Sequence, residues 1–392
     1  MKKVLFLIHT LGGGGAEKVL VNLVNGMDKQ KYNVTVMTVI DTGIFRKDLD
    51  SNIEYKSFVK IPFKKKRMQN DNNPGNLLSK SDSKLKVLAK IYVLIWKLIP
   101  SKIFYKLFIR DKYDVEVSFL EGICSKIISA STNKDSKKIG WIHVDLINHP
   151  KSSGVFTSLE DERKCYDKFD NIVCVSEVVR NSVLEKLKLN RDKVIVRYNA
   201  VNKEEILLKS QEEVSDLAKT NKFTFCTIGR LISQKGFDRL LRVHKQLVDL
   251  GYNCELWIIG EGNKRPMLEE YIKKNQLQSS VKLLGFRANP YKYLKLADAF
   301  VCSSRAEGFS TVASEAVILG KPIVTVNCSG MTELLGSHNE YGIVTENNEE
   351  ALLQGMIELM KEDVYTHYLE RVIERSEFFS FERAVRNIEE LC

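Results

Sequence analysis

Residues 305–324 read RAEGFSTVASEAVILGKPIV, and together with the residues just before them their pattern predicts a strand, a loop, a helix and a second strand in succession. The preceding residues 299–304, AFVCSS, are an apolar run that ends in turn formers, which predicts a short buried strand. Ser310 or Thr311 suits an N-cap, and apolar residues then recur at helical spacing until a glycine and a proline end the helix. Residues 323–326, IVTV, begin another strand. The helix N-terminus then lies at the carboxyl edge of a sheet, which suits an anion.

Two carboxylates lie in this stretch, Glu307 in the loop and Glu315 within an otherwise apolar helix. A carboxylate beside a phosphate site is repelled unless hydroxyl groups donate to it. A nucleotide sugar carries such hydroxyls on its ribose and on its sugar. In the alternative reading, Glu307 pairs with the helix dipole and Glu315 is a solvated charge. We interpret the two together as part of a ligand site.

Length and composition predict a globular protein with two domains. The chain has 392 residues, of which 44% are hydrophobic and 28% charged. It contains no apolar run long enough to span a membrane, and the apolar run at the N-terminus is too short for a signal peptide. Eight cysteines are scattered without CxxC pairs, which favours reduced thiols in a cytoplasmic protein.

The positive charge is concentrated in residues 60–112. This segment holds 14 Lys and Arg against three Asp, a net charge of +11, whereas the whole chain carries +10. From Lys84 to Arg110, aliphatic and aromatic residues alternate with basic ones, without an acid. We predict a pair of amphipathic helices, broken at Pro100, on an anionic membrane, because packing alone explains neither the charge nor the aromatic content. A core helix with outward lysines is the alternative, and no nucleic-acid module accompanies the patch.

The first half opens with a strand, a glycine loop and a helix. Residues 4–8 are an apolar strand, and four glycines that include Gly14 and Gly15 precede a helix at 16–27 and a strand at 32–40. Glycines let a backbone approach a ligand closely. These glycines fit neither the dinucleotide fingerprint nor the Walker pattern, so a tight turn without a ligand is the alternative.

Polar residues stand at the ends of three further predicted strands. The strands cover residues 114–120, 138–145 and 172–175, and the polar residues are Glu121, His143, Asp145 and Ser176. Because the carboxyl ends of parallel strands meet at one edge, these side chains and Gly14 can line one crevice. For His143, a purely structural role is the alternative.

After residue 200 the pattern restarts. Residues 202–222 are polar and suit a linker, and a strand, loop, helix and strand follow at 223–228, 229–236, 237–250 and 254–259. We therefore predict an α/β fold with two Rossmann-like domains that face each other across a cleft.

The loop at 229–236 replaces glycines with charge. Arg230 and Lys235 flank a strand-to-helix turn, and a guanidinium with an ammonium group suits a diphosphate. Two solvated cations are the alternative. Arg287 follows another predicted strand, at an edge where a nucleotide base could be held.

Four motifs together carry a family resemblance: GRLISQKG, RAEGFSTVASEA, LGGGGAEKVL and WIHVD. They resemble retaining glycosyltransferases of family 4 with the GT-B fold, similar to those of bacterial capsule and exopolysaccharide synthesis. The resemblance spans nearly the whole chain. It implies a nucleotide-diphosphate sugar, most often linked to UDP, and retention of the anomeric configuration.

The resemblance also implies roles for single residues. Arg230 and Lys235 would clamp the diphosphate, Glu315 would hold the ribose hydroxyls, and Glu307 would bind the transferred sugar. His143 resembles the family's active-site histidine, placed near C6 of the sugar. The backbone amides on the phosphates would be those of Gly308, Phe309, Ser310 and Thr311.

The same resemblance divides the chain. It implies an acceptor-binding domain at 1–200 with the basic, membrane-facing segment 60–112, a nucleotide-sugar domain at 201–375, and a helix at 376–392 that returns to the first domain. Gly14, Gly15 and Arg287 are expected on the side of the nucleotide sugar. Glu17, Glu121 and Asp145 are expected on the acceptor side.

The chemistry fits this assignment. Fixed cations and a helix N-terminus can stabilise a departing nucleoside diphosphate, so we expect no metal and no cofactor, with attack from the front face. An Asp-x-Asp triplet at residues 48–50 lies away from the other motifs and is set aside.

The expected partners are a nucleotide sugar, a glycan or lipid-linked acceptor and an anionic membrane surface, without nucleic acid. The expected location is the cytoplasm, at the inner face of the cell membrane. Three other functions are open: a nucleotide-sugar epimerase of the same fold, a nicotinamide oxidoreductase, whose fingerprint is missing, and a non-catalytic nucleotide-sugar-binding protein.

Overall fold

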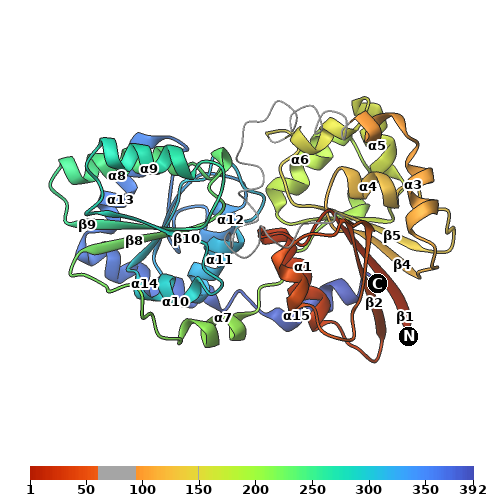
Figure 1. Ribbon diagram of the computed structural model, residues 1–392, viewed down its shortest axis with the longest axis horizontal. Coiled ribbons are helices and arrows are strands. Elements are labelled where there is room, and N and C mark those ends of the chain that lie inside the picture. The colour runs from red at the N-terminus through yellow and green to blue at the C-terminus, as the bar shows by residue number, and fades with distance from the viewer. Residues whose placement is uncertain (61–93, 149) are drawn as a thin grey trace. The chain divides into compact units, whose positions relative to one another are not determined.

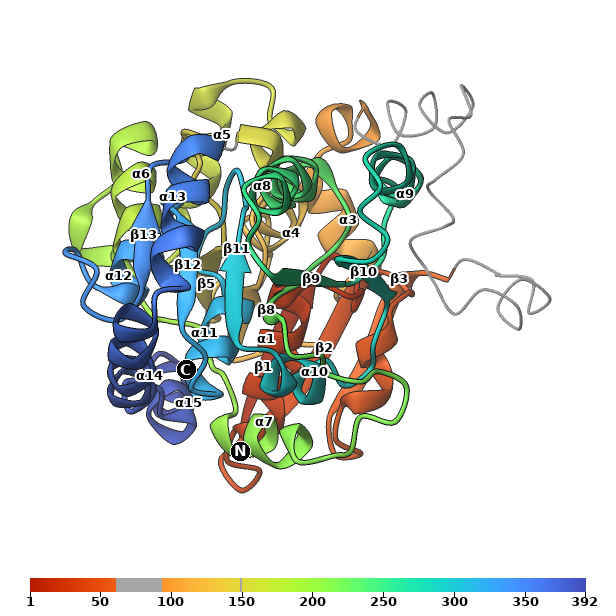
Figure 2. The same ribbon diagram turned by 90° about the vertical axis from the view of Figure 1, so that its left-hand side faces the viewer.

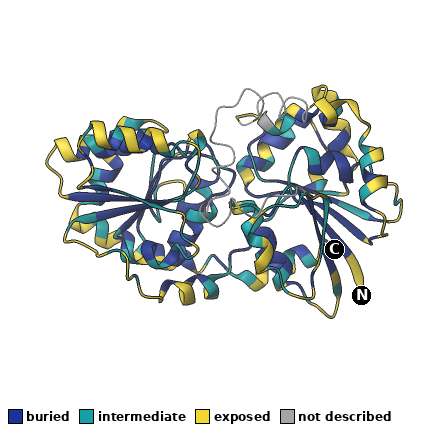
Figure 3. Ribbon diagram, viewed as in Figure 1, coloured by how far each residue is buried: buried dark blue, intermediate teal, exposed yellow. Residues whose placement is uncertain are grey.

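The structure is a computed structural model that describes residues 1–60, 94–148 and 150–392 (Figure 1). It divides into two compact units. The first contains the described residues up to Ala200 together with Glu382–Cys392, and the second contains Val201–Phe381. In both units buried residues line the strands, and exposed residues cover the outer faces of the helices (Figure 3).

The first unit is built on a parallel sheet of seven strands in the order β3-β2-β1-β4-β5-β6-β7. The strand order reverses between β1 and β4, so the loops after these two strands leave the sheet on either side of a topological switch point. The strands are β1 (Lys2–Ile8), β2 (Tyr32–Ile40), β3 (Glu54–Val59), β4 (Val115–Ser118), β5 (Lys137–Ile142), β6 (Asn171–Cys174) and β7 (Val194–Val196).

Side-chain caps start two of the helices that connect these strands. Ser158 accepts from the backbone of Asp161, and Ser176 accepts from that of Val179. The helices are α1 (Gly15–Gly26), α3 (Ser101–Phe108), α4 (Ile123–Ile128), α5 (Leu159–Asp167) and α6 (Glu177–Leu187), with short 3-10 turns at Ile44–Asp48, Pro150–Val155 and Arg191–Lys193.

The last helix, α15 (Phe381–Glu389), belongs almost entirely to the first unit. The backbone N–H of Asp28 donates to Glu389 Oε1 at 2.7 Å, and the Tyr32 hydroxyl donates to the Glu389 carbonyl at 3.0 Å. Val385 and Ile388 are buried. The end of the chain therefore completes a unit whose sheet begins at residue 2.

The second unit repeats the architecture with six parallel strands in the order β10-β9-β8-β11-β12-β13. The order reverses between β8 and β11. The strands are β8 (Phe223–Ile228), β9 (Cys254–Ile259), β10 (Val281–Gly285), β11 (Ala299–Cys302), β12 (Ile323–Val326) and β13 (Ile343–Thr345). The prediction of two Rossmann-like domains with parallel sheets is confirmed.

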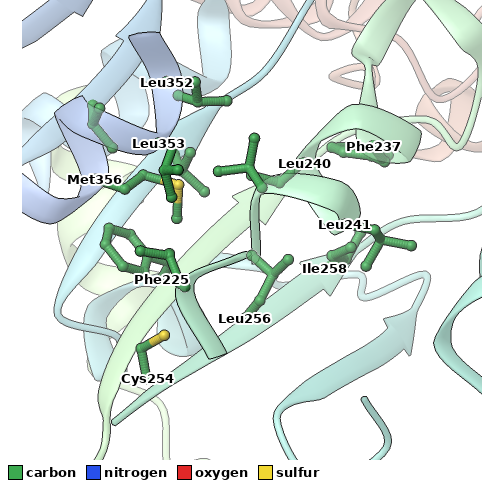
Figure 4. Packing of buried hydrophobic residues seen from close by; sticks show 14 of the residues in the cluster. Phe225, Phe237, Leu240, Leu241, Cys254, Leu256, Ile258, Leu352, Leu353 and Met356 are labelled. Atoms are coloured by element: carbon green, nitrogen blue, oxygen red, sulfur yellow. The ribbon is translucent and has the colours of Figure 1, made fainter. Parts of the chain in front are cut away.

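Helices cover both faces of this second sheet, with α8, α9 and α13 on one face and α10, α11 and α14 on the other (Figure 2). They are α7 (Lys203–Ser210), α8 (Phe237–Asp249), α9 (Arg265–Lys274), α10 (Tyr291–Leu296), α11 (Thr311–Ile318), α12 (Met331–Leu335), α13 (Glu349–Leu359) and α14 (Glu362–Ser376), with a 3-10 turn at Ser233–Lys235. In the core, Leu240 of α8 and Met356 of α13 pack in one hydrophobic cluster with Phe225 and Leu256 of the sheet (Figure 4).

The stretch predicted to be a linker, residues 202–222, is helical at its start. The Asn202 side chain caps α7 by accepting from the backbone N–H of Glu205 at 2.9 Å, and Ile206 is buried. The helix packs against α10 and α11. The linker prediction was therefore wrong for α7, because a single buried apolar residue among polar ones is too weak a signal to indicate a packed helix.

The basic segment is described only in part, because residues 61–93 lie outside the described residues. Residues 94–98 and α3 are helical on either side of Pro100, but Trp96 and Tyr105 are buried. Trp96 packs on Phe104, with ring centroids 4.2 Å apart. Packing therefore does explain these aromatic residues, contrary to the expectation. Within the described ranges, none of the helices combines the length and apolar character that a membrane span requires.

Candidate functional site

In the second unit, the two loops that flank the switch point carry the predicted cations and Glu307. The loop after β8 holds Arg230 and Lys235, and the loop after β11 holds Glu307. Ligands of open parallel sheets bind at this place, outside the carboxyl ends of the strands where the order reverses. The topology therefore brings these three residues to one edge.

Lys235 and Glu307 form an ion pair. Lys235 Nζ lies 2.6 Å from Glu307 Oε1, and the Ser304 hydroxyl donates to the same oxygen at 2.6 Å. Burial alone would lower the pKa of Lys235, but the Glu307 carboxylate outweighs it and raises that pKa, while the nearby charge of Arg230 acts against the rise. Glu307 Oε2 makes no hydrogen bond to the described residues, so it can accept from a hydroxyl group.

The two loops approach each other closely. Gly236 has φ of +68°, and a Cβ atom there would lie 2.1 Å from the Ser303 carbonyl oxygen, so only glycine fits. The Ser303 hydroxyl donates to the Lys235 carbonyl at 3.0 Å, and the backbone N–H of Arg305 donates to the Gln234 carbonyl at 2.7 Å. The positions of Lys235 and Glu307 are thus fixed by backbone contacts.

Helix α11 begins directly after this loop. Ser310 caps it, because its hydroxyl accepts from the backbone N–H of Ala313 at 3.3 Å. The partial positive charge of a helix N-terminus therefore lies at the end of the loop that carries Glu307. Gly308, Phe309 and Thr311, the other residues predicted to contact phosphates, belong to the same turn.

Glu315 lies one turn into α11 and is buried. The hydroxyl of Tyr291, the first residue of α10, donates to Glu315 Oε1 at 3.0 Å. Sequence reasoning missed Tyr291, because a tyrosine at the start of a short helix has no distinguishing pattern. Ser304 was missed as well, since it is one of two serines at the end of β11 and nothing singles it out.

Arg287 and Arg230 differ in their surroundings. Arg230 is exposed. Arg287 follows β10, with β9 and β8 between it and the switch point, and its guanidinium pairs with Asp216 at 2.8 Å and lies over the Tyr293 ring at 5.2 Å. The structure does not bring Arg287 together with Lys235 and Glu307.

In the first unit, the glycine loop follows β1 at the other switch point. Gly14 precedes α1, which starts at Gly15. A Cβ atom on Gly14 would lie 2.2 Å from Glu17 Oε2, so the Glu17 carboxylate folds back over the loop. An acidic side chain at this position is favourable, because it lies in the first turn of a helix.

Glu121 and His143 meet at the same sheet edge. The backbone N–H of His143 donates to Glu121 Oε2 at 3.0 Å, and burial raises the pKa of Glu121. Burial also lowers the pKa of His143 to about 4. One ring N–H of His143 donates to the Phe119 carbonyl, and its buried Nε2 has no partner among the described residues. His143 is therefore a neutral imidazole at physiological pH.

Asp145 closes a local turn. Its carboxylate accepts from the backbone N–H groups of Ile147 and Asn148 at 2.9 and 3.0 Å, and from the Asn148 side chain at 2.8 Å. In this structure it serves the turn after β5, and its expected contact with an acceptor stays a prediction.

The structure thus groups the predicted site residues in two sets. In the second unit, Lys235 and Glu307 are in contact beside the start of α11. In the first unit, Glu17, Glu121 and His143 follow strands at one sheet edge. In the described part of the chain, no group of three or more His, Cys, Asp or Glu side chains could hold a metal ion.

Comparison with known proteins identifies the second unit. Residues 209–377 match the family model for glycosyl transferases group 1. The second unit therefore contains a glycosyltransferase group 1 domain. A solved structure of Anabaena HepE in complex with UDP and glucose covers 100% of this chain and 99% of its own, with a TM-score of 0.72 and 19% identity. This likeness confirms the predicted GT-B fold.

Two relatives extend the comparison. An uncharacterized glycosyltransferase of Methanocaldococcus jannaschii is 27% identical over 338 residues, which cover 77% of this chain and 81% of the relative. The N-acetylgalactosamine-N,N'-diacetylbacillosaminyl-diphospho-undecaprenol 4-alpha-N-acetylgalactosaminyltransferase of Campylobacter jejuni is 32% identical over 200 residues, 50% of this chain and 53% of the relative.

The state of His143 can be tested by histidine ring NMR. We expect its signals, assigned with a His143→Gln variant, to titrate near pH 4. The unfolded chain binds this proton below about pH 6.5, so stability falls as the pH decreases from about 6.5 to about 4, by up to about 3 kcal/mol for this group. Titration of His143 near pH 6.5 would contradict its burial as a neutral ring.

Proposed function

We propose that this protein is a retaining glycosyltransferase that transfers a hexose from a UDP-linked donor. The acceptor is a glycan or a lipid-linked molecule, and the reaction belongs to cell-surface polysaccharide synthesis. The group 1 domain at residues 209–377 supports the glycosyltransferase class. The contact between Lys235 and Glu307 at the switch point carries the proposal. It combines a cation for phosphate with a carboxylate for hydroxyl groups, and a nucleotide sugar presents both.

The proposed roles follow from the contacts. Lys235 and Arg230 bind the diphosphate, aided by the positive end of α11. Glu307 Oε1 holds Lys235, while Oε2 accepts from a hydroxyl of the sugar. Glu315, whose Oε1 accepts from the Tyr291 hydroxyl, binds the ribose. The Gly308–Thr311 turn contributes backbone N–H groups.

In the proposed reaction, the bond between the anomeric carbon and the phosphate oxygen breaks. The acceptor oxygen attacks the same face, and the leaving phosphate takes its proton, so the configuration is retained. The fixed positive charges stabilise the nucleoside diphosphate as it leaves. In the first unit, the neutral His143 offers Nε2 as an acceptor for a hydroxyl hydrogen.

The proposed reaction needs no metal ion, because Lys235, Arg230 and the start of α11 supply the positive charge. Excess EDTA should therefore leave nucleotide release unchanged, within twofold, in a coupled assay of free nucleoside diphosphate. A loss of activity that magnesium or manganese restores would contradict this part of the proposal.

Lys235→Ala should lower kcat/KM for nucleotide release at least tenfold, about 1.4 kcal/mol, because it removes the half-buried cation that pairs with Glu307 in the diphosphate site. The matched control is Lys245→Ala on helix α8, which follows the turn that carries Lys235; there the lysine pairs with Asp249. A panel of nucleotide sugars, with and without membrane extract, provides the substrates.

The outcomes separate the classes of function. Conversion of a nucleotide sugar without an acceptor would indicate an epimerase, and binding without turnover would indicate a non-catalytic protein. Equal loss in the Lys235 and Lys245 variants would remove Lys235 from the diphosphate site.

We further propose that the acceptor is lipid-linked and that the first unit binds it through Glu17, Glu121 and Asp145. The name of the Campylobacter jejuni relative, which contains diphospho-undecaprenol, supports this class of acceptor. In this proposal the enzyme works in the cytoplasm, on the inner face of the membrane, through the segment from Lys84 to Arg110.

The described part of that segment presents apolar and basic side chains together. Leu98 and Leu107 are 70% and 53% exposed, and Ile103 is 48% exposed. Lys102 and Lys106 lie beside them on α3 and are also exposed. Aliphatic residues that enter the headgroup region and lysines that meet anionic lipids suit a helix lying at an interface.

Binding to vesicles tests this surface. The double variant Lys102→Glu/Lys106→Glu should bind vesicles of phosphatidylglycerol and phosphatidylcholine at least tenfold more weakly, because each lysine near an anionic surface contributes about 1 kcal/mol. The control Lys273→Glu/Lys274→Glu makes the same change in charge on exposed residues of α9. Equal binding of the wild type to anionic and neutral vesicles would contradict the proposal.

A further inference from the structure

Arg239, the third residue of α8, is a buried cation that binds the loop after β11. Its side chain is 6% exposed. Nε donates to the Ser303 carbonyl at 2.7 Å, Nη2 donates to the Ser304 carbonyl at 2.8 Å, and Nη1 donates to Asn347 Oδ1 at 2.7 Å. All three acceptors are neutral.

Among the described residues, no carboxylate is in contact with the Arg239 guanidinium. The ion pairs found in the described ranges do not include it. By contrast, Arg242 pairs with both Asp238 and Glu349, and Arg305 pairs with Asp238. Burial and the nearby charge of Arg305 lower the pKa of Arg239. Buried charges in proteins are normally paired, so a positive charge without a counterion indicates a place where a negative ligand is favoured.

The acceptors of Arg239 are the backbone from which the site is built. Ser304, whose carbonyl it binds, donates its hydroxyl to Glu307 Oε1. Because peptide groups are trans, two carbonyls that point at the guanidinium fix the orientation of the turn. A Cβ atom on Gly236 would lie 2.9 Å from Arg239 Nε, so the guanidinium also lies against the loop that carries Lys235.

We propose that Arg239 is a positioning residue of the nucleotide-sugar site: it fixes the turn at Ser303 and Ser304 that places Glu307 against Lys235, and its unpaired charge favours a bound nucleoside diphosphate. The inference rests on the proposed function of the same site. Arg239 acts through its neighbours, since its three donor nitrogens already bind the protein.

Two substitutions separate hydrogen bonding from charge. Arg239→Lys keeps the charge but cannot reach three separate acceptors, and Arg239→Gln can keep one or two hydrogen bonds but loses the charge. Arg371→Gln on α14, which pairs with Glu374, is the matched control. Calorimetry gives the Kd for UDP, and the nucleotide-release assay gives kcat and KM.

We expect both Arg239 variants to bind UDP at least tenfold more weakly, Arg239→Gln more so than Arg239→Lys, and to raise KM for the nucleotide sugar more than they lower kcat. The control should keep wild-type values. A merely structural role would lower thermal stability and leave the Kd of the folded fraction unchanged.

Ser304→Ala keeps the test decisive if the Arg239 variants do not fold. It removes only the hydroxyl on Glu307 and should raise KM for the nucleotide sugar at least threefold. Where both variants fold, the effects of Arg239→Lys and Ser304→Ala should be less than additive in the double variant, because both act on Glu307.

These experiments distinguish a failure of the proposed function from a failure of the inference about Arg239. If the wild type neither binds UDP nor releases nucleotide from any nucleotide sugar, the proposed function fails. If the wild type does so and the folded Arg239 variants match it in Kd and KM, the inference about Arg239 is overturned and the proposed function stands. Wild-type kinetics in Ser304→Ala, when Arg239 variants do not fold, would likewise overturn it.

Discussion

The close approach of two loops at Gly236 and Ser303 is the constraint on which the second unit's site depends. The backbone after β8 lies so close to the backbone after β11 that no side chain fits at residue 236. Lys235 then meets Glu307 at 2.6 Å without a long, flexible connection. A site held by backbone contacts and a buried guanidinium is preorganised, which reduces the reorganisation needed when a charged ligand binds.

The sequence was sufficient for the fold and for part of the site. Short apolar runs bounded by turn residues predicted β8 and β9 with their observed bounds, and Ser310 was one of two N-caps considered for α11. The charges of Lys235 and Glu307 stood out because they follow strands where a loop is usually neutral. These signals are local, and parallel strand order then places them at a common edge.

Contacts between distant residues could not be read in the same way. Tyr291 reaches Glu315, and Arg239 reaches residues 64 and 65 positions further along the chain, through packing that no local pattern encodes. In the basic segment, by contrast, the sequence pattern led to a wrong prediction. Its aromatic residues suggested a surface, but Trp96 and Tyr105 are buried, and only the third dimension separates inward from outward residues on so short a helix.

The return of α15 to the first unit affects how the chain folds as it is made. The second unit is continuous from Val201 to Phe381, so all of its strands leave the ribosome in one uninterrupted segment. The first unit lacks its segment Glu382–Cys392 until more than 180 further residues, from Val201 to Phe381, have been synthesised. Until then the surface that receives Val385 and Ile388 stays open to solvent. The unit made first is therefore the one completed last.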